Sequence, residues 1–384
     1  MMRLPMTIPP GLEELMPDVP ADVFNATFRA ACERLDRFIG ALAVELAAQL
    51  GIGPGELLPA ERVCAERGWR PAGELAIRWL IETLELYGAA ERRDGRLWLR
   101  ADPPPVPSAR LRAEAESIFP ASRPAYEVFS LSAATLPAVL RGETRGEDAL
   151  FGPSAMGLWF DYFSNSNPHY APNNSVTAIA IERSVGTSAR VLEVGGGAGS
   201  AAQLVLRTLA RAGKAPELYV FTEPQPAFLR RGVRAIQPEL PNGCAFRSLR
   251  FDIDLDAAGQ GLDAVGFDVI FGVNTVHLAR DMVGTLRRLR ELLRPGGVVV
   301  VGELMRPSPT AAVHLELPFT LLSAYSQVSL EDGIRARPGF MSPEGWRRAF
   351  RAAGFAELTT LPAEVERCAQ IYPGFYCGAL AARA

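Results

Sequence analysis

Hydrophobic positions near the start of the chain repeat at helical spacing. The apolar positions of residues 22–50 lie on one face of a single long helix, which a turn rich in glycine and proline ends. Two shorter helices are predicted at about 57–67 and 71–87. Asp94 and Gly95 then separate two short strand-forming segments, which is typical of a β-hairpin. Helices followed by a hairpin predict a winged-helix module.

The proline-rich stretch 103–107 predicts a stiff linker, so we place a domain boundary near residue 105. Residues 108–185 have mainly helical periodicity, and we interpret them as a helical linker and lid. Within them the asparagine-rich stretch 165–174 is expected to be irregular, with a new helix beginning near Ser175.

Strands and helices alternate from residue 189 onward, which predicts a largely parallel sheet. The expected strands are 190–194, 218–222, 246–251, 267–272 and 297–303, with two more near 355–361 and 374–380. The fold class is therefore α/β, a doubly wound seven-stranded sheet preceded by a helical winged-helix domain and a helical lid. The predicted domains are 1–105 (a dimerisation or pocket domain), 106–185 (linker and lid) and 186–384 (catalytic domain).

Composition and charge exclude several partners. The 384 residues are 48% hydrophobic, and a formal net charge of −3 gives no electrostatic reason to expect nucleic acid or an anionic membrane. The five cysteines are scattered without a paired motif, so we expect reduced thiols and no metal site. No stretch approaches the roughly 20 apolar residues of a membrane span, and residues 1–20 lack the apolar segment of a signal peptide. We expect a cytoplasmic protein.

The strongest chemical signal is a glycine-rich turn after the strand at 190–194. Glu193, Gly195, Gly197 and Gly199 follow the pattern E-x-G-x-G-x-G, and a helix-forming stretch comes next. Glycines in such a turn let a nucleotide-like ligand approach the backbone, since a Cβ would collide with the ligand or the helix. The acid ahead of the turn suits a ligand with a cationic amino acid part, and no phosphate-binding lysine follows. The pattern resembles the first motif of class I S-adenosylmethionine (SAM) methyltransferases.

Acidic residues at the ends of the next two strands extend this cofactor site. Glu223 follows the second strand, where a carboxylate can accept both hydroxyls of a ribose. After the third strand we expect Asp252 to accept the adenine amino group and Ile253 to pack on the adenine ring. Asp254 and Asp256 are alternatives for the adenine contact.

The fourth and fifth strands lead into a candidate catalytic pair. His277 lies at the carboxyl end of a central strand, where α/β sheets place their chemistry, and a neutral imidazole there can take a proton near neutral pH. Glu303 ends the adjacent strand and can orient that imidazole. Asn274 is expected to help bind SAM or the methyl acceptor.

Further motifs over about residues 110–384 resemble the C-methyltransferase domains of polyketide synthases. They lie at 127–145, 221–230, 260–261, 274–277, 292–297 and 317–355. The resemblance implies a Rossmann-like SAM-binding domain, an N-terminal module that dimerises or closes the pocket, and deprotonation of an acidic carbon by His277 with Glu303. The family usually has aspartate in place of Glu223 and tends to have Gly-Trp-Trp where this chain has residues 323–325, so we expect a reshaped substrate pocket.

The asparagine-rich loop at 165–174 is a further departure from the family, and it lies where a lid over SAM would lie. A tyrosine ring there can stabilise the sulfonium of SAM by a cation–π contact. The candidates for the substrate site and lid are Tyr162, His169, Tyr170, Asn173, Asn174 and Tyr325.

These observations leave three functions open. The first is methyl transfer from SAM, to carbon or oxygen, on a small polyketide or amino- or keto-acid-derived natural product that is free or carried by a protein. The second is a SAM-consuming cyclase that makes azetidine-2-carboxylate and methylthioadenosine. The third is a SAM-binding winged-helix regulator, although glutamates interleaved with the arginines of 57–99 disfavour DNA binding. The long apolar helix at 22–50 favours a homodimer.

Overall fold

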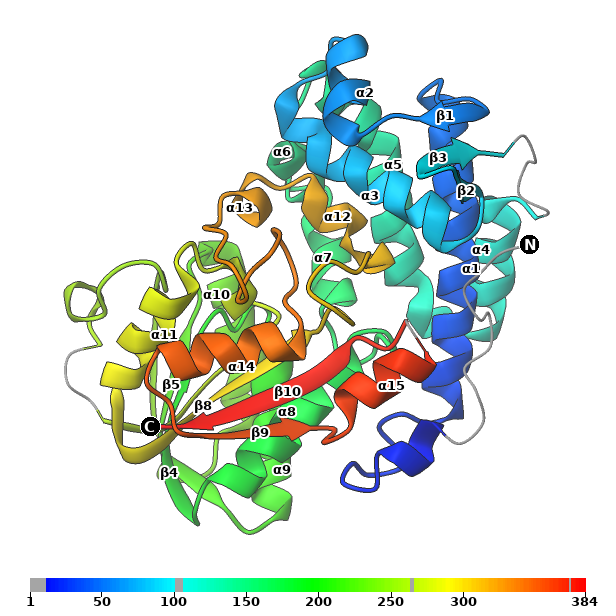
Figure 1. The fold of residues 1–384 in the computed structure, drawn as a ribbon. Helices are drawn as coiled ribbons and strands as arrows, with labels where there is room; N and C mark the ends of the chain where they lie inside the picture. The colour runs from blue at the N-terminus through cyan, green and yellow to red at the C-terminus, as the bar shows by residue number, and fades with distance from the viewer. Residues whose placement is uncertain (1–11, 101–105, 263–265, 373) are drawn as a thin grey trace.

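A computed structural model describes residues 12–100, 106–262, 266–372 and 374–384. Most of the proline-rich stretch 103–107, and residues 1–11 of the N-terminal segment considered above, lie outside this part of the chain. An α/β half built on a seven-stranded sheet adjoins a mostly helical half that carries a small three-stranded sheet (Figure 1). No helix of the described part is both long and apolar enough to cross a membrane.

The N-terminal helices and hairpin form as the hydrophobic periodicity predicts. They are α1 (Ala26–Gln49), α2 (Ala60–Glu66), α3 (Glu74–Leu86), β2 (Ala90–Arg93) and β3 (Arg96–Leu99). Asp94 and Gly95 join the two strands, and both have the positive φ that a tight hairpin turn of this kind needs. The sequence did not predict β1 (Gly55–Leu57), which pairs with β3 and completes the order β1-β3-β2.

The helices of the middle segment correct one prediction. They are α4 (Ser108–Ile118), α5 (Arg123–Arg141), α6 (Gly146–Leu150), α7 (Met156–Tyr162) and α8 (Ala171–Ser184). The expected start of a helix near Ser175 is wrong, because α8 begins at Ala171. Pro172 lies in the first turn, where its missing N–H removes no helical hydrogen bond. Asn173 and Asn174 are consequently buried helical residues and not parts of a solvated loop.

The helical half and the sheet have separate hydrophobic cores. Helices α1, α3, α5 and α7 pack around large side chains such as Phe38, Trp79 and Phe129, and α12 (Leu317–Thr320) from the C-terminal half joins them. Helix α8 packs instead on the sheet. The apolar face of α1 is thus covered by the chain's own helices, which removes the reason for expecting a dimer through that face. The homodimer and the domain boundaries at 105 and 185 stay predictions.

The main sheet has the order β6-β5-β4-β7-β8-β10-β9, in which β10 runs antiparallel to both neighbours. Its strands are β4 (Ser188–Glu193), β5 (Ala215–Thr222), β6 (Ala245–Leu249), β7 (Phe267–Val273), β8 (Leu293–Leu304), β9 (Glu357–Leu361) and β10 (Cys377–Arg383). Each was predicted from sequence to within a few residues. The seven-stranded α/β fold is confirmed.

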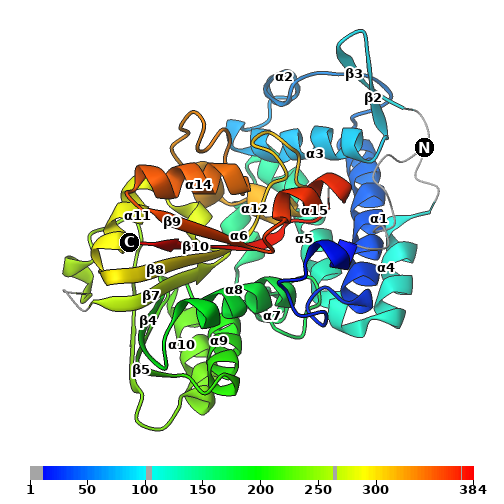
Figure 2. The same cartoon turned by 60° about the horizontal axis from the view of Figure 1, so that its bottom comes forward.

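Helices cover both faces of this sheet (Figure 2). On one face lie α8, α9 (Ser200–Arg211) and α10 (Pro226–Ile236), and on the other lie α11 (Met282–Glu291) and α14 (Pro343–Ala352). Two short helices, α13 (Ser323–Ser326) and α15 (Val365–Ile371), complete the C-terminal half. The strand order reverses between β4 and β7, and such a switch point opens a crevice at the carboxyl ends of the strands.

Candidate active site

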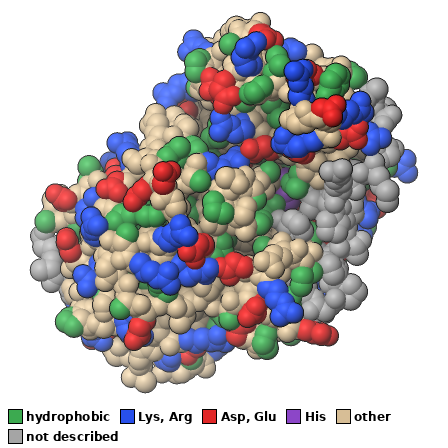
Figure 3. Space-filling view, in the orientation of Figure 1, with side chains coloured by type: hydrophobic (Ala, Val, Ile, Leu, Met, Phe, Trp, Pro, Cys, Tyr) green, Lys and Arg blue, Asp and Glu red, His purple; other side chains and the backbone are tan. Residues whose placement is uncertain are grey.

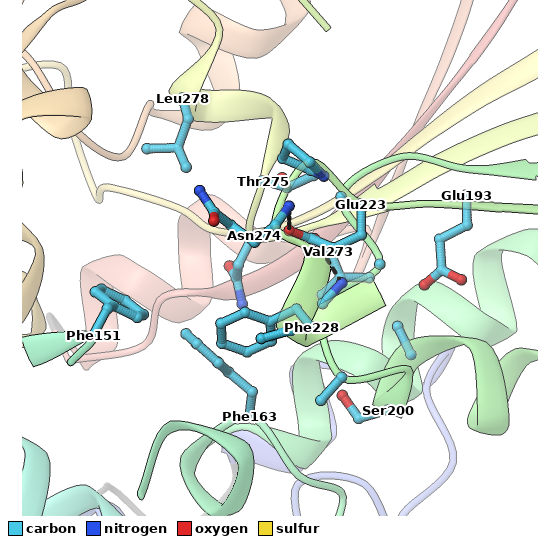
Figure 4. A pocket seen from close by; sticks show the side chains of 18 of the residues that line it. Phe151, Phe163, Glu193, Ser200, Glu223, Phe228, Val273, Asn274, Thr275 and Leu278 are labelled. Atoms are coloured by element: carbon cyan, nitrogen blue, oxygen red, sulfur yellow. Dashed lines mark hydrogen bonds between the residues drawn. The ribbon is translucent and has the colours of Figure 1, made fainter. Parts of the chain in front are cut away.

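A cavity of about 550 Å³ opens over the glycine turn between β4 and α9 (Figure 4). Its polar wall contains Glu193, Glu223 and Asn274, which come from the ends of three different strands. Aromatic side chains of α6 to α10 and their connections face them, namely Phe151, Phe163, Tyr170 and Phe228. A pocket of this size with a few convergent polar groups suits a nucleoside-sized ligand.

Two glycines of the turn are required by its shape. Gly195 has φ +61°, and a Cβ added to it would lie 2.1 Å from the hydroxyl oxygen of Thr275. Gly199 has φ +86° and begins α9, and a Cβ there would lie 3.0 Å from the backbone of Gly232 on α10. The turn therefore brings its backbone against the cavity in a conformation that L side chains rarely adopt.

Glu193 lies at the floor of the cavity and is only 1% exposed. The Tyr219 hydroxyl donates a hydrogen bond to its Oε2 at 2.8 Å, while Oε1 has no partner among the described residues. Burial raises the pKa of this carboxyl to about 8. The carboxyl therefore lies buried beneath the cavity floor, and a cation bound in the cavity would stabilise its ionised form.

Glu223 is held by the backbone of its own turn and of the glycine turn. Its Oε2 accepts the N–H of Gly197 at 3.0 Å, and its Oε1 accepts the N–H of Gln225 at 2.9 Å. Burial raises the pKa of Glu223 as well. Each oxygen keeps a free lone pair toward the cavity, so the fixed carboxylate can accept two neighbouring ligand hydroxyls.

A second cavity of about 210 Å³ shares Gly195, Thr275 and Leu278 with the first. Of the three candidate acids, Asp252 and Asp254 line it and Asp256 does not. The Oδ1 of Asp252 accepts the backbone N–H of Asp254 at 2.9 Å, whereas Arg280 contacts both oxygens of Asp254, Oδ1 through its backbone N–H at 2.8 Å and Oδ2 through its guanidinium at 3.6 Å. Asp252 therefore keeps one oxygen without a partner among the described residues. Ile253 lies between the two acids on the same wall.

Gln260 holds the loop that carries Asp252. Its side-chain Oε1 accepts the Asp252 N–H at 2.7 Å, and its Nε2 donates to the Asp252 carbonyl at 2.9 Å. Gln260 belonged to a motif that carries the family resemblance, but the sequence offered no reason for its presence.

His277 and Glu303 form a buried pair at the ends of β7 and β8. His277 lies just beyond the end of β7, in a short 3₁₀ turn (Val276–Leu278). Its Nδ1 lies 2.7 Å from Oε2 of Glu303. The backbone N–H of His277 donates to Oε1 of the same carboxylate at 3.3 Å. The side chains are 5% and 1% exposed, respectively. The Nε2 atom of His277 has no hydrogen-bond partner among the described residues.

A third cavity of about 150 Å³, the acceptor cavity, lies against His277. It is mostly apolar and aromatic, with walls from Leu304, Leu315, Phe319 and Phe340. Phe151, Phe163, Tyr170 and Asn274 line both this cavity and the 550 Å³ cavity, so the two adjoin. His277, with its free Nε2, thus lines a cavity directly beside the 550 Å³ cavity.

A second buried histidine, His314, provides a comparison for the free Nε2 of His277. Nε2 of His314 lies 2.7 Å from Asp36, and its Nδ1 lies 3.0 Å from the hydroxyl of Tyr376. Both ring nitrogens of His314 are therefore occupied, whereas only one is occupied in His277. Of these two histidine–carboxylate pairs, only the one at 277 has a ring nitrogen without a partner among the described residues.

Asn274 adopts a left-handed conformation with φ +50°, which asparagine tolerates better than most residues. Its backbone N–H donates to the carbonyl of Gly302, and its Oδ1 accepts the N–H of Leu304, both at 2.8 Å. Asn274 therefore links β7 to β8 near the His277–Glu303 pair, and its side chain also lies beside the hydroxyl of Tyr170.

The lid candidates separate into two groups. Tyr162, His169, Tyr170 and Tyr325 line the acceptor cavity, and Tyr170 also lines the 550 Å³ cavity. Asn173 and Asn174 line neither. Asn174 supports the site from outside, because its Nδ2 donates to the hydroxyl of Ser200 in the first turn of α9 at 3.1 Å.

The segment 323–325, where the chain departs from the family, contributes to the acceptor cavity. The Tyr325 hydroxyl donates to Glu316 at 2.8 Å, and Arg306 pairs with the same carboxylate. This network holds the Tyr325 ring beside His277 at 6.0 Å between centroids. The sequence did not identify Phe151, Phe163 and Phe228 as residues of the site, because nothing in their local sequence distinguishes them from ordinary core positions.

Comparisons with known proteins bear on the domain and on the fold. Residues 192–299 match the family described as a methyltransferase domain. Polyketide synthase ThaQ of Burkholderia thailandensis is 27% identical over 301 residues, which are 73% of this chain but 14% of that protein. The chain therefore spans only a small part of this curated relative.

Two solved structures have the same fold. The CurJ carbon methyltransferase superposes with a TM-score of 0.75 at 21% identity and covers 98% of this chain and 96% of its own. The trans-methyltransferase CalH, in complex with S-adenosylhomocysteine (SAH), superposes with a TM-score of 0.66 at 22% identity. That match covers 91% of this chain and 90% of the CalH chain. The chain therefore contains a methyltransferase domain at residues 192–299 and has the fold of these two methyltransferases, and it is similar to a polyketide synthase over 73% of its length.

Proposed function

We propose that the protein transfers the methyl group of SAM to an acidic carbon of a polyketide-type acyl intermediate. The observation that carries this proposal is the free Nε2 of His277, which lies in a cavity that adjoins the nucleoside-sized site. When bound, SAM supplies an electrophilic methyl group that needs no further activation.

The residues that would hold SAM fit its parts. We assign Glu193 to the cationic amino acid end, Glu223 to the ribose hydroxyls and Asp252 with Ile253 to the adenine. The place of Glu193 in the cavity wall and the backbone-fixed carboxylate of Glu223 support the first two assignments. Tyr170 lines both cavities where they adjoin, which suits a ring that faces the sulfonium.

We assign the proton transfer to His277. Its Nε2 would take the proton from the acceptor carbon, while Glu303 holds the ring through Nδ1 and stabilises the imidazolium that forms. The aromatic and aliphatic walls of the acceptor cavity exclude water and position the carbon in line with the methyl group. The acceptor is free or carried by a separate protein in this proposal.

The N-terminal module is proposed to close the acceptor cavity. Leu35 of α1 lines that cavity, and the indole N–H of Trp79 on α3 donates to the carbonyl of His314 at 2.9 Å. A DNA-binding role is disfavoured because the arginines of the module are paired with its glutamates, as in Arg92–Glu85 at 2.7 Å and Arg96–Glu56 at 3.0 Å. Figure 3 shows the two charge types interspersed over the upper part of the molecule.

The test is incubation of the purified protein with SAM and a small 3-oxoacyl thioester, followed by mass spectrometry. The proposal expects SAH and an acceptor that carries one added methyl group on carbon. A methyl enol ether would establish O-methylation instead. Methylthioadenosine formed with SAM alone would establish the cyclase, which needs no acceptor cavity.

A further inference from the structure

Arg335 is a fully buried arginine in the connection between α13 and α14. It is only 1% exposed. Its backbone is fixed by a closed turn of its own segment, because its N–H donates to the carbonyl of Glu331 at 2.8 Å and its carbonyl accepts the N–H of Glu331 at 3.0 Å. The side chain therefore starts from a defined position in the connection.

The guanidinium of Arg335 contacts the turn that carries His277. Its Nη1 donates to the carbonyl of Ala279 at 2.7 Å, and its Nη2 donates to the carbonyl of His277 itself at 3.2 Å. The backbone N–H of Ser329, in the same connection, donates to the carbonyl of Arg280 at 2.8 Å. One connection from the C-terminal half thus binds three carbonyls of the turn at 276–280.

No ion pair accounts for the burial of this cation. Arg306 is also fully buried, and its guanidinium pairs with the carboxylate of Glu316. The Arg335 guanidinium instead contacts only carbonyls among the described residues, and its Nε has no partner there. Because buried arginines are nearly always paired with a charge, the contacts with the turn are the interactions that retain Arg335 in this place.

The charge of Arg335 bears on the carboxylate of the catalytic pair. Burial lowers the pKa of Arg335 to about 10, so the guanidinium remains a cation near pH 7. The negative charges that act on it are those of Asp254, Glu303 and Asp281. Of these three, Glu303 is the one that contacts the imidazole of His277. The cation therefore offsets part of the negative charge that is buried with the base.

The same connection also contributes to the wall of the acceptor cavity. Tyr325 and Phe340, which precede and follow Arg335 in the chain, both line that cavity. The ring of Phe340 lies 4.8 Å from the ring of His277, and the ring of Tyr325 lies 6.0 Å from it, between centroids. The connection therefore contacts His277 through its ring and through its backbone, which links the position of the base to that of the cavity wall.

We propose that Arg335 is a positioning residue for the base, which fixes the turn at 276–280 so that the imidazole of His277 keeps one orientation toward the acceptor. The inference rests on the proposed function and adds to it a residue that lines none of the three cavities of the site. Misplacement of a reacting group by about 1 Å can lower a rate about 10²-fold. Loss of the two carbonyl contacts is therefore expected to slow proton transfer and to spare binding.

The test compares two replacements of Arg335 in the full-length protein. Arg335→Met keeps an unbranched side chain but removes every donor, and it should lower kcat about 10²-fold while the KM of the acceptor and the Kd of SAM stay unchanged. Arg335→Lys keeps the charge and can reach one carbonyl, so it should recover part of the lost kcat. Wild-type kcat in Arg335→Met would overturn the proposal.

Arg337→Met is the matched control. Arg337 follows two residues later, and its side chain is only 10% exposed, but it pairs with Glu82 of α3 at 2.9 Å and does not contact the turn at 276–280. This variant should lower the melting temperature and leave kcat unchanged. An equal loss of kcat in both methionine variants would indicate general destabilisation and would overturn the positioning role.

Nuclear magnetic resonance gives a readout that does not depend on turnover. The chain has only three histidines, so the ring signals of His277 can be assigned by comparison with His277→Ala. Arg335→Met should change these signals and leave those of His169 and His314 unchanged, whereas Arg337→Met should change none. If thermal melting shows that Arg335→Met does not fold, Arg335→Lys decides, and unchanged His277 signals with unchanged kcat would overturn the proposal. Changed His277 signals in a protein that forms no SAH with any acceptor would instead contradict the proposed function.

Discussion

Nδ1 of His277 lies 2.7 Å from Oε2 of Glu303, and the two side chains come from the ends of adjacent parallel strands. The carboxylate binds the same residue twice, since it also accepts the backbone N–H of His277 at 3.3 Å. This double contact fixes the ring so that only Nε2 remains available to a substrate. A proton acceptor with one free nitrogen is what abstraction of a carbon-bound proton requires.

Replacement of the base should slow the chemical step and spare SAM binding. His277→Ala is expected to lower kcat by about 10²–10⁴-fold, because the proton then has no positioned acceptor. Glu303→Gln should cause a smaller loss, since an amide can still contact Nδ1 but stabilises the imidazolium less. Single-turnover SAH formation and calorimetry with SAM separate the two effects. Unchanged turnover in His277→Ala would exclude this residue as the base.

The acids at the ends of β5 and β6 are expected to determine cofactor affinity. Glu223→Ala and Asp252→Ala should each raise the Kd for SAM by roughly 10–100-fold, the cost of losing hydrogen bonds to a charged group. Asp256→Ala is the control, because Asp256 does not line the cofactor cavities and should leave the Kd unchanged. If Asp254→Ala weakens binding and Asp252→Ala does not, the adenine contact belongs to Asp254.

The glycine turn can be tested with two glycines that share a positive φ. Gly195→Ala should abolish SAM binding, because φ is +61° and the added methyl group would collide with Thr275. Gly213 at the far end of α9 has φ +68° with open space around its Cβ position. Gly213→Ala should therefore cost only about 1 kcal/mol of stability and leave SAM affinity intact. Equal loss of SAM affinity in both variants would point to general strain and not to the turn.

Glu193 should make SAM binding depend on pH. Because burial raises its pKa to about 8, the carboxyl is mainly protonated at pH 7 in the free protein. A cation bound against it favours the ionised form, so binding releases a proton and affinity rises with pH, levelling off above about 8. Calorimetry in buffers of different ionisation enthalpy measures the released proton.

Glu193→Gln provides the control for this titration, since it retains a partner for the Tyr219 hydroxyl without ionising. Subtracting its profile removes any titration of SAM itself. Equal proton release by the variant and the wild type would show that Glu193 does not bind the cationic end.

Much of the α/β half could be predicted because its signals are local. Alternating strand and helix patterns, the glycine turn after Glu193 and the acid after β5 each depend on residues adjacent in sequence. The pairing of His277 with Glu303 could also be predicted from the sequence, because neighbouring parallel strands that end at the same edge of a sheet bring their next residues together. The predicted start of α8 was wrong because asparagine and proline favour loops in a local sequence pattern. In the folded protein Asn173 and Asn174 are buried, and this segment is helical.

The sequence by itself thus determined the sheet, the glycine turn after Glu193 and the pairing of His277 with Glu303, since strand ends and turns carry their own residue requirements. Only the tertiary structure decided which side chains enclose the acceptor cavity. Leu35, Phe151 and Phe319 come from segments far apart in the chain, and packing alone brings them around His277. The contacts of Arg335 with the turn at 276–280 likewise arise only when the two segments pack together, which no spacing of residues along a chain can express.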